Sequence, residues 1–118
     1  EWLREFGIRS FLQEIGGDRV NVVGMLEGTA NGVSLQLNGH LDTNYSGEED
    51  DLIFMSPALF RRPQHTKRSY VKDGRIYGIG VGNMKAGLAA MLTSIVAVKR
   101  SGIALKGDFI VSTPFPLP

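Results

Sequence analysis

The feature that most constrains the fold is a long apolar helix followed by an apolar strand. Apolar residues recur at helical spacing from Lys85 to Arg100, and Gly102 follows as a stop signal. The run from Phe109 to Val111 is then typical of a buried strand. A helix that leads into such a strand indicates a βαβ crossover. It therefore predicts an α/β fold, with a mostly parallel sheet flanked by helices in three αβα layers, incomplete in this chain.

The N-terminal region carries apolar side chains near helical spacing. They are Trp2, Leu3, Phe6, Phe11, Leu12 and Ile15, and they predict an amphipathic helix over residues 2–15. Gly16 and Gly17 follow, and glycines commonly end helices. We therefore expect the chain to begin with a helix.

Strands and turns are expected between the two helices. Residues 20–26 are rich in β-prone side chains, and residues 28–32 have the composition of a turn. Apolar and polar residues alternate over 33–38, which predicts a strand. An Asp-Gly pair between two β-prone stretches predicts a hairpin over 70–77.

Composition limits the class of protein. The 118 residues suit one domain or part of one, and 13 basic against 12 acidic side chains favour neither a nucleic-acid nor a membrane surface. No apolar run approaches the roughly 18 residues of a membrane span. The absence of cysteine excludes thiolate metal sites and is compatible with a cytoplasmic protein. Because the chain begins at Glu1 without Met or a basic leader, we expect a fragment or a processed product.

A polar motif, NGHLDT, ends the strand expected over residues 33–38. His40 and Asp42 are two residues apart, so on an extended backbone they point to the same side. An imidazole ligand with a carboxylate that orients it is a recurring arrangement in metal hydrolase sites. The alternative is a polar strand end that holds no ligand.

A glycine-rich stretch, YGIGVGNMKAGLAA, leads into the long helix at residues 77–90. Such a stretch is either a flexible strand-to-helix turn or a phosphate-binding loop, because glycine-rich helix N-termini bind anions. Neither G-x-x-x-x-G-K-[ST] nor G-x-G-x-x-G is present. Phosphate binding is therefore disfavoured.

The two motifs together resemble the co-catalytic zinc amidohydrolases and peptidases. That group includes acetylornithine deacetylase, succinyl-diaminopimelate desuccinylase, aminoacylase and glutamate carboxypeptidase. Its motifs are roughly G-H-x-D and D-G-x-x-Y-G-R-G-x-x-D-M-K-G-G, matched here by NGHLDT and DGRIYGIGVGNMKAGLAA. The resemblance implies that residues 1–118 are the N-terminal part of a catalytic domain. Residues 1–113 are family-like, and 114–118 are an irregular Pro-rich tail.

The resemblance also implies roles for individual residues. His40 matches a zinc ligand, Asp42 matches the catalytic carboxylate beside it, and Asn83 stands where the family has a metal-bridging Asp. Lys85 matches the Lys of the second motif and is expected to have a structural role. The implied cofactor is zinc, or cobalt or manganese. The implied reaction is hydrolysis of an amide bond in a small amino-acid-derived substrate by metal-activated water.

The chain departs from the family at two places. Asn83 has one neutral carbonyl oxygen, whereas a bridging ligand needs two anionic oxygens. The family's acidic segment, with its general base, follows a G-D-L strand. Aligning Gly107 and Asp108 with that strand places residues 116–118, Pro-Leu-Pro, at the acidic positions. Asn83 therefore predicts either altered or lost metal use.

Two hypotheses follow for function. The first is a fragment of a metal-dependent amide hydrolase that is inactive by itself and whose parent is expected to form a homodimer. The second is a non-catalytic α/β module with a degenerate metal site. In either case we expect self-association through an exposed sheet edge.

The region between the motifs is expected to be irregular over residues 44–69. It contains the acidic run Glu48–Asp51 and His65, which lies between basic pairs. A solvated loop is the expectation for both, with substrate selection or cation binding as the alternative for the acidic run. A long irregular stretch of this kind is often functional.

Overall fold

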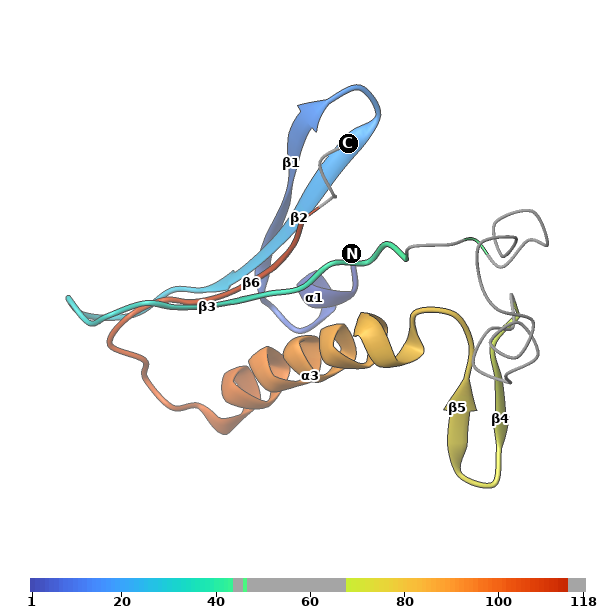
Figure 1. Ribbon diagram of the computed structural model, residues 1–118. Coiled ribbons are helices and arrows are strands. Elements are labelled where there is room, and N and C mark those ends of the chain that lie inside the picture. The colour runs from blue at the N-terminus through green and yellow to red at the C-terminus, as the bar shows by residue number, and fades with distance from the viewer. Residues whose placement is uncertain (44–45, 47–67, 115–118) are drawn as a thin grey trace.

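The computed structural model describes residues 1–43, 46 and 68–114, which form a mixed α/β fold (Figure 1). A four-stranded sheet has the order β1-β2-β6-β3, and one long helix, α3, packs against it. The predicted α/β class is thus confirmed. The elements are β1 (Arg9–Gly16), β2 (Arg19–Leu26), β3 (Leu35–Asn38), α3 (Ala86–Ser101) and β6 (Phe109–Thr113).

The strand pairing differs from the predicted, mostly parallel sheet. β1 pairs with β2 and β2 pairs with β6, both antiparallel, and β3 pairs with β6 in parallel. The parallel pair is joined through α3, as expected of a βαβ crossover. The prediction of a mostly parallel sheet is wrong because β2 runs antiparallel to β6, and because β1, built from residues that were expected to be helical, adds a second antiparallel pair.

The helix expected over residues 2–15 is confined to one short turn, α1 (Trp2–Glu5). Gly7 has a φ of +67°, a left-handed conformation that ends helices. Phe11 and Ile15 fit helical spacing with the apolar residues before Gly7, yet they belong to β1. The spacing of apolar residues therefore did not distinguish a helix from a strand here. The expected helix stop at Gly16 and Gly17 is instead the tip of the β1–β2 hairpin.

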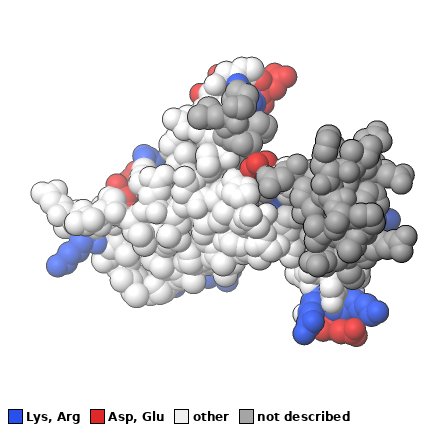
Figure 2. Space-filling model, in the orientation of Figure 1, with Lys and Arg blue, Asp and Glu red and all other residues white. Residues whose placement is uncertain are grey.

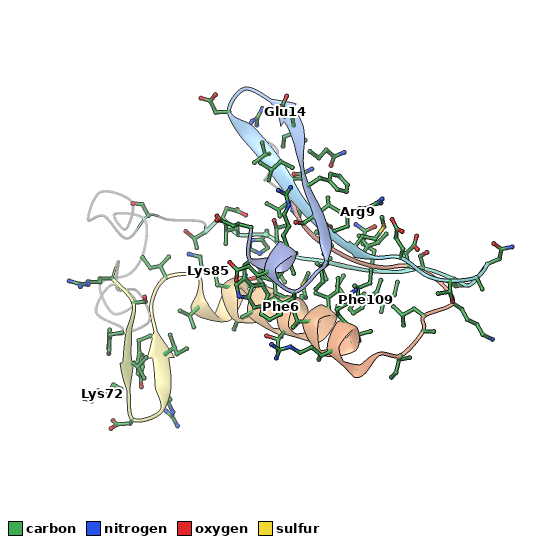
Figure 3. The ribbon with its side chains drawn as sticks, turned by 180° about the vertical axis from the view of Figure 1, so that it is seen from behind. Phe6, Arg9, Glu14, Lys72, Lys85 and Phe109 are labelled. Atoms are coloured by element: carbon green, nitrogen blue, oxygen red, sulfur yellow. The ribbon has the colours of Figure 1, made fainter. Side chains whose placement is uncertain are left out.

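The hydrophobic core lies between the sheet and α3. Ile95 of α3 is completely buried and belongs to the same core cluster as Phe109 and Val111 of β6 (Phe109 is labelled in Figure 3). Leu3 of α1 joins the same cluster, so α1 and α3 lie on one side of the sheet. Among the described residues two of the three predicted layers are therefore present.

The β2–β3 connection crosses the start of β6 at very close range. A side chain at Gly107 would overlap the backbone carbonyl of Val33, so only glycine fits there. The backbone N–H of Gly28 donates a 2.8 Å hydrogen bond to Oδ1 of Asp108. These contacts set where β3 enters the sheet beside β6.

A second, two-stranded sheet precedes α3. β4 (Tyr70–Lys72) and β5 (Arg75–Tyr77) form the predicted hairpin. Asp73 and Gly74 at its tip both have positive φ, the conformation that Asp-Gly turns adopt. Charged side chains gather over this tip in Figure 2, whereas the middle of that face carries few.

A turn at Val81–Lys85 joins β5 to α3. Asn83 and Met84 have non-helical dihedrals, and their shared peptide bond is cis. The regular helix therefore begins at Ala86, one residue after the predicted start, and ends at Gly102 as predicted.

Counted together, this turn and α3 form a segment long and apolar enough to cross a membrane. The segment Val81–Ser101 has 21 residues and a mean hydropathy of 1.4. The turn is not regular helix, however, and α3 buries Leu88, Ile95 and Val96. Since the core helix of a soluble protein has the same composition, the segment carries little weight as a membrane span.

Two expectations concern residues that lie outside the described part of the chain. They are the solvated loop with His65 and Glu48–Asp51, and the end of the Pro-rich tail at 115–118. Both stay predictions.

Candidate metal centre

The first motif begins where β3 leaves the sheet. The backbone N–H of Gly39 donates a 3.1 Å hydrogen bond to the carbonyl of Ser112 in β6. The chain then continues without regular secondary structure through His40 and Asp42. The strand expected to carry these residues therefore ends two residues before His40. The motif lies just past the carboxyl end of a parallel strand, where α/β folds commonly place their ligands.

His40 and Asp42 meet as their spacing predicted. Nδ1 of His40 lies 3.1 Å from Oδ1 of Asp42 and 3.2 Å from the Asp42 carbonyl oxygen. Both oxygens are acceptors, so Nδ1 carries the proton that it donates to them. In the neutral ring, Nε2 then presents a lone pair on the opposite side.

The lone-pair side of His40 faces Asn83. Nε2 of His40 lies 3.1 Å from Oδ1 of Asn83, although the two residues are 43 positions apart. The fold thus brings together all three residues singled out by the sequence. With Nδ1 protonated, two acceptors face one another across this gap, an arrangement that a shared cation stabilises.

The centre is open to solvent. The side chains of His40 and Asp42 are 39% and 37% exposed, and Asn83 is also exposed. At this exposure the His40–Asp42 contact contributes little to stability, and its main effect is to orient the ring.

Lys85 has the structural contacts expected of it. Its backbone N–H donates a 2.9 Å hydrogen bond to the carbonyl of Gly80, and its Nζ donates one of 3.4 Å to the carbonyl of Ile79. Lys85 therefore ties the start of α3 back onto the loop that precedes Asn83. Figure 3 shows it at that end of the helix.

The geometry fits two ligands of one metal ion. Two ligand atoms bound to a tetrahedral zinc at roughly 2.0–2.1 Å lie about 3.3 Å apart, close to the observed separation of Nε2 and Oδ1. A zinc site takes three or four protein ligands. Residues 1–43, 46 and 68–114 contain no cluster of three or more His, Asp or Glu side chains able to hold a metal. At most part of a metal centre is therefore present among these residues.

The sequence interpretation missed a close contact between the two motifs. Gly39 precedes His40 and Met84 follows Asn83, and the side chain of Met84 packs directly on Gly39. The available signal was their position in the two motifs. Nothing in the spacing indicated that they touch.

Comparisons with known proteins agree with the motifs. Residues 36–113 match the model of peptidase family M20/M25/M40. A probable succinyl-diaminopimelate desuccinylase of Staphylococcus epidermidis is 30% identical over 105 residues, which cover 89% of this chain and 23% of that protein.

A second kind of relative is an N-formyl-4-amino-5-aminomethyl-2-methylpyrimidine deformylase. The protein of Bacillus subtilis is 30% identical over 114 residues, 95% of this chain and 24% of the relative. That of Halalkalibacterium halodurans is 36% identical over 92 residues, 76% of this chain and 19% of the relative.

The chain thus spans about a quarter of the length of these relatives or less. The family match covers both motifs, β3, α3 and β6. From the match and the geometry together, the chain belongs to peptidase family M20/M25/M40.

Proposed function

We propose that this chain contributes the first part of a metal-dependent active site that hydrolyses an amide bond. The observation that carries the proposal is the 3.1 Å approach of Nε2 of His40 to Oδ1 of Asn83 at the carboxyl end of β3. Further ligands and a general base are needed from outside residues 1–43, 46 and 68–114. The described residues by themselves are therefore expected to be insufficient for activity.

Each residue has a distinct part in this proposal. Asp42 accepts a hydrogen bond from the Nδ1–H group of His40 and thereby holds the ring in the tautomer with a free Nε2. His40 and Asn83 then present one nitrogen and one oxygen to the same ion. A bound divalent ion would lower the pKa of a water molecule and polarise the scissile carbonyl.

Asn83 favours one ion in place of the family's two. The Asn83 side chain has one neutral carbonyl oxygen, whereas a residue that bridges two metal ions needs two anionic oxygens. Carbonyl oxygens suit harder cations such as Mn²⁺, whereas zinc sites use His, Cys and carboxylates. Manganese or cobalt is therefore a candidate beside zinc.

The substrate class follows from the relatives. Their names describe removal of a succinyl or a formyl group. We propose that the parent protein of this chain removes an acyl group from the nitrogen of a small, amino-acid-derived compound. An open centre with a solvent-facing His40 suits such a substrate.

The second candidate function is a module that binds no metal. Rotating the Asn83 amide by half a turn would place its N–H₂ group against Nε2 of His40. Asn83 would then donate a hydrogen bond to Nε2 of His40, and Nδ1 of His40 would donate one to Asp42. This arrangement needs no ion and would be structural.

Metal analysis separates the two candidates. We expect the full chain to take up at most one Zn²⁺, Co²⁺ or Mn²⁺ per molecule, His40→Ala to bind none, and Asn83→Asp to bind more tightly. A metal content equal in all three proteins would favour the module. Two tightly bound ions in the unmodified chain would overturn the interpretation of Asn83.

A further inference from the structure

The two motif segments run past each other in opposite directions. No strand ladder joins them, yet contacts occur at matching positions along both segments. The pairs in contact are Gly39 with Met84, His40 with Asn83, and Gly80 with Thr43. The polar pair is thus flanked on each side by a contact between a glycine and a side chain of the opposite segment.

The first flanking contact seats Met84 against glycine backbone. A methyl group at Gly39 would lie 2.6 Å from Cε of Met84 and 3.0 Å from Leu88. A methyl group at Gly87 would lie 3.2 Å from the same Cε. The thioether therefore fills the space that a side chain at either glycine would need. Gly39 is itself buried and hydrogen-bonded to β6.

The second flanking contact involves Gly80 and Thr43. A methyl group at Gly80 would lie 2.5 Å from Cγ2 of Thr43. Gly80 also has a φ of +74°, a conformation that favours glycine. Gly80 thus serves two purposes: its positive φ suits the turn, and its missing side chain permits the close approach to Thr43 of the first motif.

The glycines let the two segments approach closely, because Met84 and Thr43 occupy the space that a side chain at Gly39 or Gly80 would need. Nε2 of His40 lies 3.1 Å from Oδ1 of Asn83, and His40 is partly exposed while Asn83 is exposed. Their relative position is therefore set by the neighbours that are packed. Shifting a ligand by about 1 Å is enough to spoil a metal site, because bond lengths vary by only about 0.2 Å.

We propose that Met84 and Thr43 are positioning residues: by seating on Gly39 and Gly80, they set the separation of His40 Nε2 and Asn83 Oδ1. This inference rests on the proposed metal-binding function. It assigns no catalytic part to either residue. Loss of positioning weakens metal binding without unfolding the chain.

The test measures Zn²⁺ affinity of the full chain by competition with a chromophoric chelator, and the visible spectrum with bound Co²⁺. Gly39→Ala pushes Met84 away and should weaken Zn²⁺ binding by about 10-fold or more, the range seen for residues that orient ligands. Its Co²⁺ spectrum should also change, because the ligand geometry changes. Met84→Leu keeps the volume and should stay close to the unmodified chain.

A double variant makes the test specific. In Gly39→Ala/Met84→Ala the new methyl group occupies space left by the thioether, so Zn²⁺ affinity should recover relative to Gly39→Ala alone. Val96→Ala is the matched control, since Val96 is buried in the core away from the centre. It should lower thermal stability and leave Zn²⁺ affinity and the Co²⁺ spectrum unchanged.

The outcomes distinguish a failure of the positioning role from a failure of the proposed metal-binding function. If His40→Ala binds Zn²⁺ as tightly as the unmodified chain, the metal site itself is overturned and the inference with it. If His40→Ala abolishes binding while folded Gly39→Ala keeps the original affinity and spectrum, the positioning role alone is overturned. Should Gly39→Ala not fold, unchanged affinity and spectrum in both Met84→Ala and Thr43→Ser would overturn it.

Discussion

The helix–sheet interface and the candidate metal centre are held together in different ways. Ile95 and Phe109 meet inside a closed apolar core. His40 and Asn83 meet in the open, on segments without regular secondary structure. The first region is defined by buried area, the second by a few close contacts to glycine. Substitutions in the core should therefore change stability, and substitutions at the centre should change binding.

The largest expected effect is in the core. Ile95→Ala removes most of a fully buried side chain and should lower the free energy of unfolding by about 2–5 kcal/mol. Urea denaturation followed by circular dichroism measures it. Ile95→Val is the control and should cost roughly 0.5–1.5 kcal/mol. A loss for Ile95→Ala no greater than for Ile95→Val would contradict the core described here.

The next effect concerns the crossing of two loops. Gly107→Ala should lower the free energy of unfolding by about 1–3 kcal/mol, because its methyl group meets the Val33 backbone, which cannot move aside. Gly82→Ala is the matched control, since no atom of the described residues lies within 4 Å of a methyl group there. Equal thermal stability of the two variants would rule out the close crossing.

The centre should respond in binding more than in stability. Asp42→Ala removes the acceptor that orients His40 and should weaken Zn²⁺ binding by about 10–100-fold. Its melting temperature should stay near that of the unmodified chain, because the pair is exposed. Isothermal titration and a thermal melt on the same sample check both. A large loss of stability with unchanged Zn²⁺ binding would contradict the expectation that substitutions at the centre change binding and not stability.

The smallest effect is expected at the surface. Arg9 and Glu27 form a 2.7 Å ion pair whose side chains are 59% and 61% exposed. Arg9→Ala should change the free energy of unfolding by no more than about 1 kcal/mol, since water screens the pair. Urea denaturation at low and high salt tests this. A larger, salt-independent loss would mean that Arg9 acts through packing.

The second half of the fold could be predicted from the sequence. The β4–β5 hairpin, α3 and β6 each carry a local signal, such as Asp-Gly, helical periodicity or an apolar run. The N-terminal region could not be predicted in this way. Phe11 and Ile15 satisfy helical spacing by coincidence, and pairing of β1 with β2 decided the outcome. The positive φ at Gly7 was a stop signal inside the expected helix.

For the candidate site, the sequence by itself determined which residues are the candidates. Residue type and motif spacing pointed to His40, Asp42 and Asn83, and to the family, because such chemistry needs particular side chains in a particular order. Only the tertiary structure decided that Nε2 of His40 meets Asn83 and that Met84 seats on Gly39. Contacts between segments some forty residues apart depend on how β3 and α3 pack. No local pattern in the chain specifies the distance between Nε2 of His40 and Oδ1 of Asn83.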